Sequence, residues 1–256
     1  MSTLPLLAAR GLSVTIAGIR VCHDLDFCVR AGERWAILGC NGAGKTTLLH
    51  TLAGLRPPDG GTIELDGRAL DALAAREMAL IRGLLPQDDG DAFGATVLET
   101  ALIGRHPHIP RWQWEGENDV RIAREALQAL DIAHAETRDV RTLSGGERRL
   151  VALAALFAQM PRLFMLDEPS SHLDLAHQLA LLESLAAFTR DARAVIMVLH
   201  DINLAARFCD HVLILDKGHA IAGSAQELLT SERLSRTYGV RLRKLGEEGI
   251  AVFAPE

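Results

Sequence analysis

The sequence predicts an α/β protein with a mainly parallel sheet, because short apolar runs that suit buried strands alternate with longer segments of helical periodicity. The expected strands are 34–39, 163–166 and 194–199, and the helices expected between and after them include 45–53 and 175–188. Polar motifs follow at the carboxyl ends of these strands. Open α/β sheets bind their ligands at that edge.

The stretch from about 90 to 160 predicts helices and no clear strand. The three expected helices are 96–105, 119–130 and 146–159. A helical segment inserted into a sheet domain explains this change of pattern. After 211–215, glycines and short strand-like pieces predict a final strand pair, followed by a small C-terminal appendage around Tyr238 and Gly239.

Composition limits the functions open to the chain. With 256 residues, of which 48% are hydrophobic, it can bury a substantial core in one or two domains. A formal net charge of −6 gives no overall attraction to nucleic acid, so no nucleic acid is expected as a partner. The apolar runs are shorter than the roughly 20 residues of a spanning helix, and residues 1–10 lack the basic start of an export signal. We therefore expect a cytoplasmic chain unless a partner holds it at a membrane.

A glycine-rich segment at 39–46 matches the pattern G-x-x-x-x-G-K-[ST] between an expected strand and an expected helix. Such glycines let backbone N–H groups and the helix N-terminus surround a phosphate chain. Lys45 would reach the β- and γ-phosphates, and the Thr46 hydroxyl would bind Mg²⁺. The residues expected to bind the nucleotide here are Gly39, Cys40, Asn41, Gly42, Ala43, Gly44, Lys45, Thr46 and Thr47.

Two carboxylates follow the apolar run at 163–166. Asp167 suits the coordination shell of Mg²⁺, while Glu168, one residue further and differently directed, could polarise an attacking water. An Asp-Glu pair after a strand is more often a solvated turn. The phosphate loop in the same chain favours the catalytic interpretation.

A second glycine pair, in Leu143-Ser144-Gly145-Gly146-Glu147, opens an expected helix of its own. Ser144 can cap this helix, and the glycines leave its first amides open to an anion. One chain with one nucleotide has no obvious use for two phosphate cradles. A head-to-tail dimer has such a use if Ser144, Gly145 and Gly146 close in trans on the ATP of the other chain. The alternative is an ordinary capped helix start.

In the order and spacing of these motifs, nearly the whole chain resembles the ATP-binding cassette (ABC) family. The resemblance implies an α/β P-loop NTPase cassette with a mixed, mainly parallel core sheet, an N-terminal antiparallel β portion and an inserted α-helical subdomain. It divides one ABC domain into a first catalytic part at 1–89, a helical subdomain at 90–160, and a second catalytic part with the C-terminal appendage at 161–256. ATP hydrolysis with Mg²⁺ is the implied activity.

The same resemblance assigns roles to residues outside the phosphate loop. Gln87 resembles the glutamine that senses Mg²⁺ and water and connects to the membrane subunits, which makes it a catalytic residue and, with Thr46 and Asp167, a metal ligand. His200 resembles the switch histidine that holds the γ-phosphate against the catalytic Glu168. Outside this family, Gln87 would be an ordinary loop residue and His200 a plain strand-end histidine.

The subgroup is indicated by stretches that resemble importer ATPases for iron chelates and cobalamin. These stretches are 173–178, 199–206 and 228–240. Leu153-Ala154-Ala155 and the C-terminal pattern favour vitamin B12 slightly over ferric siderophore or haem. The resemblance implies a motor at the cytoplasmic face of the inner membrane, working as a head-to-tail dimer with two transmembrane permease subunits and, indirectly, a substrate-binding protein. Residues 170–174 match the loop by which the two motor subunits contact each other.

Two alternative functions belong to other classes of protein. Soluble ABC-class ATPases of DNA repair or translation usually carry a long coiled-coil insertion or two cassettes in one chain, and this sequence has neither. An unrelated phosphate-loop kinase would need an acceptor site and has no use for the glycines at 145 and 146.

The chain departs from the family pattern at two positions expected near the nucleotide. Ile16 lies near the place where many members stack an aromatic residue on adenine, so stacking should be weaker or supplied elsewhere. Cys40 occupies a position that is often proline. It is either a neutral substitution or a reactive, nucleotide-protected thiol. The four cysteines show no metal-site spacing, which predicts reduced thiols.

A loop at 106–114 carries two tryptophans at the start of the helical insert. Trp112 and Trp114 either pack on the insert or contact the membrane partner, because exposed Trp and Arg favour interfaces. A metal site built on His106 and His108 lacks further ligands at suitable spacing.

Overall fold

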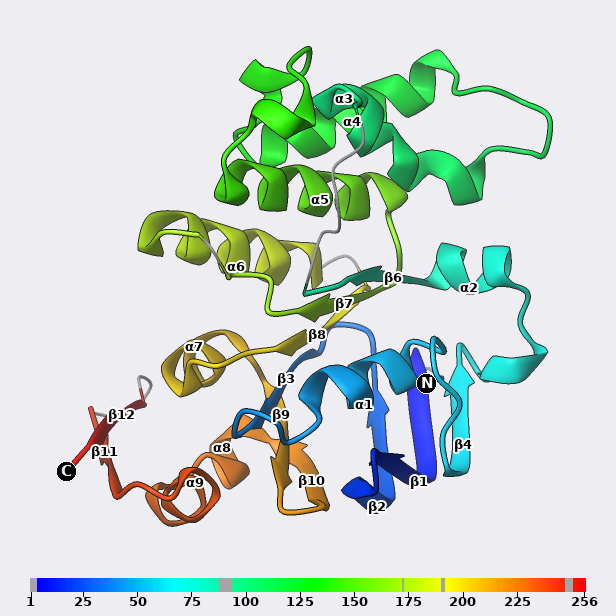
Figure 1. Ribbon diagram of the computed structural model, residues 1–256. Helices are drawn as coiled ribbons and strands as arrows, with labels where there is room; N and C mark the ends of the chain where they lie inside the picture. The colour runs from blue at the N-terminus through cyan, green and yellow to red at the C-terminus, as the bar shows by residue number, and fades with distance from the viewer. Residues whose placement is uncertain (1–3, 88–93, 172, 190–191, 247–250) are drawn as a thin grey trace.

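The computed structural model describes residues 4–87, 94–171, 173–189, 192–246 and 251–256. Within these residues, a six-stranded sheet has the order β10-β9-β3-β8-β7-β6 (Figure 1). All neighbouring strands are parallel except the β9–β10 hairpin. Its strands are β3 (Arg34–Gly39), β6 (Arg82–Leu85), β7 (Leu163–Asp167), β8 (Ala194–Val198), β9 (His211–Asp216) and β10 (His219–Ser224). The predicted mixed, mainly parallel sheet is confirmed.

Strands β7 and β8 are buried along their whole length because both faces of the sheet are covered. Alternate residues of a strand point to opposite faces. Phe164 and Leu166 thus pack on one face and Leu163 and Met165 on the other, in two separate hydrophobic cores. A parallel strand covered on both faces needs a continuous apolar run, which is the pattern that predicted these strands.

Helix α1 (Lys45–Leu52) and a small antiparallel sheet cover one face (Figure 1). That sheet has the order β2-β1-β4-β5 and pairs its described strands antiparallel. Its strands are β1 (Leu7–Ile16), β2 (Ile19–Val29), β4 (Gly60–Leu65) and β5 (Arg68–Ala69). The expected N-terminal antiparallel portion is therefore present.

The other face packs on α6 (Leu175–Thr189), α7 (Ile202–Phe208) and the helices between residues 97 and 159. These are α3 (Val97–Leu102), η2 (Ile103–His108), α4 (Glu117–Ala129), η3 (Ala133–Ala135), η4 (Val140–Thr142) and α5 (Gly145–Gln159), the η elements being 3₁₀ helices. Phe157 of α5, Phe164 of β7 and Phe188 of α6 form an aromatic cluster with ring centroids 4.5–5.9 Å apart. The helical segment and the sheet therefore share one continuous core.

The helix predicted over 96–105 is present, but its α-helical part ends at Leu102 and a 3₁₀ helix follows. Pro107 lacks an N–H and its ring excludes a continued α-helix. Gly104 also packs so closely on α5 that a Cβ there would lie 1.9 Å from the Ala155 carbonyl oxygen. Among the described residues of this segment, β pairing is limited to an isolated bridge between Thr96 and Asp139.

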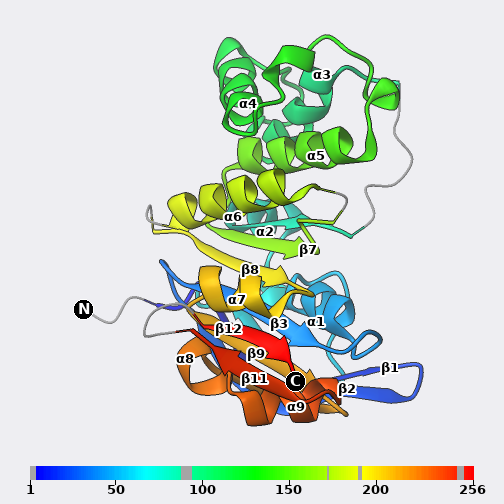
Figure 2. The ribbon, with the colours of Figure 1, turned by 90° about the vertical axis from the view of Figure 1, so that its left-hand side faces the viewer.

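The remaining elements lie at the edges of the molecule (Figures 1 and 2). They are η1 (Leu70–Ala72), α2 (Ala75–Ile81), α8 (Ala225–Leu228), α9 (Ser231–Tyr238), β11 (Leu242–Leu245) and β12 (Val252–Pro255). Asn203 ties the β11–β12 hairpin to α7, since its side-chain amide donates to the Phe253 carbonyl (3.2 Å) and accepts from the Phe253 N–H (2.7 Å). Across the ranges that the structure describes, each helix is too short or too polar to cross a bilayer.

Candidate functional site

The segment at 39–46 leads from β3 into α1, and its backbone depends on glycine. Gly39, Gly42 and Gly44 have positive φ angles of 150°, 77° and 94°, which glycine adopts without steric cost. A Cβ at Gly44 would lie 2.5 Å from a methyl group of Val21, and one at Gly39 would lie 2.8 Å from the Leu215 carbonyl oxygen. The loop can therefore hold this curve only with glycine at these positions.

Lys45 is the first residue of α1 and is only 6% exposed. Its ammonium donates to the carbonyl oxygens of Gly39 (2.9 Å) and Cys40 (3.1 Å). Burial lowers the pKa of Lys45, while the nearby Glu168 charge acts in the opposite direction. The loop thus holds a buried cation beside the amides at the start of α1.

Asp167 is the last residue of β7 and is fully buried. Among the described residues, no donor lies in hydrogen-bonding geometry to either of its carboxylate oxygens. Burial raises its pKa, although the Thr46 side chain lies close enough to favour the charged form. A buried carboxylate that lacks a partner, beside a hydroxyl, offers the oxygen ligands that Mg²⁺ prefers. These two residues therefore fit a magnesium ion.

Glu168 has the left-handed φ of 48°, unusual for a residue with a side chain. Its Oε1 lies 2.5 Å from Nε2 of His200. His200 follows the end of β8, the strand that pairs with β7. An imidazole with its hydrogen on Nε2 donates to this carboxylate. The structure thus brings Glu168 and His200 together beside Lys45 and Asp167, as the sequence led us to expect.

Gln87 follows Pro86 after β6 and is exposed. No hydrogen bond joins its side chain to another residue of the described ranges, so the structure does not place it in the group around Lys45. In the expected subunit-contact loop, the Ser171 hydroxyl donates to the Glu168 carbonyl oxygen (2.9 Å). His172, which belongs to the same expectation, lies outside the described residues.

The second segment expected to bind phosphate, Ser144–Gly146, lies at the start of α5. Ser144 Oγ accepts the Glu147 N–H (3.2 Å), and the Ser144 N–H donates to the Glu147 carboxylate (2.8 Å), which forms a capping box. Ser144 and Gly145 are exposed, and a Cβ at Gly145 would meet nothing within 4 Å. The first turn of α5 therefore faces open space.

The two cradles lie apart in the chain's own fold. Figures 1 and 2 both show α5 near the top of the molecule and the loop between β3 and α1 well below it, with α6, β7 and β8 in between. Among the described residues, Ser144 is hydrogen-bonded to Glu147, and no hydrogen bond or ion pair joins Ser144, Gly145 or Gly146 to Lys45, Asp167 or Glu168.

Arg149 is a site residue that the sequence did not single out. Its guanidinium is buried and donates to the carbonyl oxygens of Pro86 (2.6 Å), Asp167 (2.7 Å) and Glu168 (3.1 Å). The sequence feature that could have identified it is its spacing of four residues from Leu153, which places both side chains on the buried face of α5. A cation on such a face must find buried acceptors.

The C-terminal part touches the phosphate loop. Cys40 is exposed at the loop, and its Sγ donates to the Thr237 carbonyl oxygen of α9 (3.1 Å). All four cysteines are free thiols, as expected. Ile16 is 44% exposed at the end of β1.

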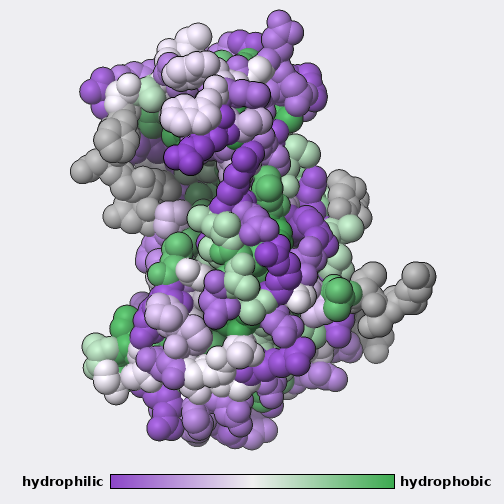
Figure 3. Space-filling model, turned by 90° about the vertical axis from the view of Figure 1, so that its right-hand side faces the viewer, coloured by the Kyte–Doolittle hydropathy of each residue, from purple (hydrophilic) through white to green (hydrophobic). Residues whose placement is uncertain are grey.

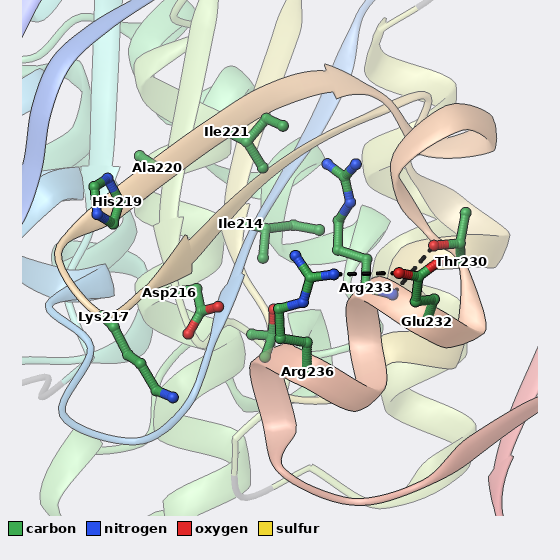
Figure 4. A pocket seen from close by; sticks show the side chains of 11 residues that line it. Ile214, Asp216, Lys217, His219, Ala220, Ile221, Thr230, Glu232, Arg233 and Arg236 are labelled. Carbon is green, nitrogen blue, oxygen red and sulfur yellow. Dashed lines mark hydrogen bonds and ion pairs between the residues drawn. The ribbon is translucent and has the colours of Figure 1, made fainter.

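A hollow of about 620 Å³ lies between the β9–β10 hairpin and α9 (Figure 4). Lys217, Arg233 and Arg236 line it, and Arg236 is paired with Glu232 at 3.2 Å. Among the described residues of its lining, none belongs to the motifs at 39–46, 144–146 or 167–168. We therefore assign no nucleotide contact to this hollow.

Comparisons with known proteins agree with this geometry. The model of the family described as ABC transporter matches residues 22–171. The hemin import ATP-binding protein HmuV of Myxococcus xanthus is 40% identical over 245 residues, which cover 93% of this chain and 91% of that protein. The protein of the same description from Gloeobacter violaceus is 41% identical over 244 residues, covering 92% and 88%.

Solved structures show the same fold. A metal-chelate type ABC transporter in an inward-facing conformation matches with a TM-score of 0.86 and 29% identity, covering 99% of this chain and 98% of that one. Clostridium perfringens cbiO1, part of the ABC transporter complex cbiONQ, matches with a TM-score of 0.76 and 26% identity, covering 91% and 93%.

Thiol labelling tests the phosphate loop through Cys40. At pH 8 Cys40 should react in the folded chain because it is exposed. Cys22 and Cys209 should stay unmodified, since burial raises their pKa values to about 11 and about 12 and leaves roughly one thiolate in a thousand or fewer. Saturating ATP should slow the modification of Cys40, as measured by mass spectrometry. The half-buried Cys28 is the matched control, and an ATP effect on Cys28 but not on Cys40 would contradict the assignment.

Proposed function

This chain belongs to the ABC transporter family, and from that premise we propose that two copies share each ATP, the phosphate loop of one facing the start of α5 of the other. The chain is an ATPase. The observation that supports this proposal most strongly is the meeting of Lys45, Asp167, Glu168 and His200 at one edge of the central sheet, while Ser144 and Gly145 are exposed at the start of α5.

In the proposed reaction, loop amides and Lys45 bind the β- and γ-phosphates of ATP. Thr46, Asp167 and Gln87 would hold Mg²⁺, which neutralises charge on the phosphate oxygens when bound. Glu168 takes a proton from a water that attacks the γ-phosphorus, and the bond to the leaving ADP oxygen breaks with its electron pair. His200 orients the Glu168 carboxylate and contacts the γ-phosphate.

The dimer follows from the separate positions of the two cradles. The first turn of α5 is exposed and capped by its own Ser144 and Glu147, so its free amides and dipole favour an anion brought by another molecule. In a head-to-tail pair, each copy would bring its bound ATP to the start of α5 of the other copy. The helical segment at 97–159, which we propose as a subdomain within the boundaries 90–160, would carry the resulting motion to the membrane subunits. The catalytic parts would then be 1–89 and 161–256.

A second surface suits a membrane-spanning partner. Trp112 and Trp114 are 91% and 89% exposed, so they do not pack on the insert. Their loop is fixed by Arg76 of α2, whose guanidinium donates to the carbonyl oxygens of Pro107 (2.8 Å) and Ile109 (3.2 Å). Exposed aromatics beside arginine are typical of protein interfaces.

A hollow of about 620 Å³ lies between this tryptophan loop and α2. Figure 3 shows this side of the molecule, with hydrophobic side chains gathered across its middle. The partner that we propose is a segment of the permease subunit, because the family works in transporter complexes such as that of cbiO1. The chain would then sit peripherally on the cytoplasmic face of the inner membrane.

The cargo that we propose is haem. The relatives described above are named hemin import ATP-binding proteins and cover nearly the whole chain. Their names favour an iron chelate over the cobalamin that Leu153–Ala155 and the C-terminal pattern had slightly favoured. A substrate-binding protein would deliver the cargo to the permease.

Replacing Glu168 by Gln should reduce the kcat of ATP hydrolysis by about 10²–10⁴-fold and leave ATP affinity nearly unchanged, because the amide cannot accept the proton. The variant should also accumulate as a dimer in Mg²⁺-ATP, as seen by light scattering. Glu183→Gln, on the exposed side of α6, is the control and should turn over normally. A Glu168→Gln chain that hydrolyses ATP at the normal rate would contradict the assigned base.

In the same assay, a mixture of Lys45→Ala and Ser144→Arg chains should restore ATP hydrolysis at no more than one of the two sites that the proposed dimer shares. Full activity of each variant alone would rule out shared sites.

Changing Trp112 and Trp114 together to Ser should weaken retention of the permease subunits during purification from membranes. ATP hydrolysis by the free subunit should stay the same, because neither tryptophan belongs to the motifs at 39–46, 144–146 or 167–168. Replacing the exposed Leu55 by Ser is the matched control. If the doubly changed chain retains the permease as firmly as the unchanged chain, the tryptophan loop is not the docking surface.

Cargo can be tested in vesicles that contain the chain with its co-purified permease. A haem-loaded binding protein should raise the rate of ATP hydrolysis, whereas cobalamin should leave it at the basal rate. Stimulation by cobalamin alone would overturn the haem assignment and leave the ATPase assignment untouched.

A further inference from the structure

One buried side chain links three parts of the candidate site. Arg149 is 1% exposed on α5, and its guanidinium reaches two other segments of the chain. One terminal nitrogen donates to the Pro86 carbonyl oxygen (2.6 Å), and the other to those of Asp167 (2.7 Å) and Glu168 (3.1 Å). A guanidinium is planar and presents its donors in a fixed fork, so it fixes these carbonyls relative to one another.

The Glu168 carbonyl belongs to a strained residue. A φ of 48° is disfavoured for a residue with a Cβ and persists only where the surroundings hold it. Among the described residues, Arg149 of α5 and Ser171 hold it. The N–H (3.1 Å) and the hydroxyl (2.9 Å) of Ser171 donate to the same oxygen as Arg149. Without Arg149, the backbone at Glu168 can relax and carry its carboxylate away from His200.

The Pro86 carbonyl adds a second connection. Pro86 directly precedes Gln87, so the guanidinium that holds Glu168 also fixes the origin of the loop that bears Gln87. Arg149 itself lies one helical turn from Gly145, at the start of α5. A shift of α5 on contact with a second copy would therefore be transmitted to Glu168 and to Gln87 together.

We propose that Arg149 is a positioning residue for ATP hydrolysis: its guanidinium holds the backbone of Glu168 in the conformation that directs the carboxylate to the γ-phosphate, and ties that conformation to the Gln87 loop and to α5. This inference rests on the proposed role of Glu168. Arg149 touches neither ATP nor the attacking water and acts through the residues that do.

The test compares Arg149→Lys with Arg105→Lys. Arg105 is also buried and also donates to a carbonyl of α5, that of Ala158 (2.8 Å), and it pairs with Asp119 far from Glu168. Lysine keeps the charge at both positions but lacks the planar fork of donors with which the guanidinium holds several carbonyls in fixed relative positions. Arg149→Lys should lower kcat by about 10- to 100-fold, as expected for a misplaced catalytic group, with ATP affinity within about twofold of the unchanged chain. Arg105→Lys should lose thermal stability and keep its kcat.

A double variant separates positioning from a general loss of structure. If Arg149 acts through Glu168, adding Arg149→Lys to a Glu168→Gln chain should not reduce the single-turnover rate further, because effects within one unit are not additive. A further loss of the same factor would overturn the proposal. So would a normal kcat in Arg149→Lys, or a kcat loss in both lysine variants that follows their loss of thermal stability. Normal turnover by Glu168→Gln alone would instead contradict the proposed base.

Discussion

The site depends on two buried charged side chains at the end of the parallel sheet, Lys45 and Asp167, where burial disfavours the charged form of each. Asp167 is fully buried with both carboxylate oxygens unpaired among the described residues, and Lys45 is buried with only loop carbonyls as its acceptors. Burying such groups is unfavourable unless a partner compensates them. In the proposed site, a phosphate chain with its cation would supply a partner to each of them. The glycine loop, the parallel strand order and the covered faces of the sheet all serve to keep these two groups in place.

The same constraint is consistent with the proposed sharing of each site between two copies. One chain provides the phosphate loop, the buried cation and the carboxylates, whereas Ser144 and Gly145 at the start of its α5 are exposed. In the proposed dimer, the ATP bound by the other copy would supply the anion at this helix start. Arg149 would couple the start of α5 to Glu168. It belongs to the helix that would meet the partner, and its guanidinium donates to the Glu168 carbonyl oxygen.

The local features of this fold were predictable from sequence. The strands near 34–39 and 163–166 were found because a strand covered on both faces must be apolar throughout, and the phosphate loop because its glycines and lysine occur at fixed spacing. Features set by contacts between distant segments were not predictable. The helix after Leu102 changes to 3₁₀ where Gly104 meets Ala155, and Arg149 gains its role only where α5, Pro86 and β7 converge. The exposure of Trp112 and Trp114 also depends on how Arg76 fixes their loop.

The most direct test of the shared site is an experimental structure of the full-length chain with Mg²⁺ and a non-hydrolysable ATP analogue. We expect two nucleotides at the interface of two copies, each touching Lys45 of one copy and Ser144, Gly145 and Gly146 of the other. Nucleotides whose phosphates are contacted by a single chain, with the start of α5 facing solvent in both copies, would contradict this expectation.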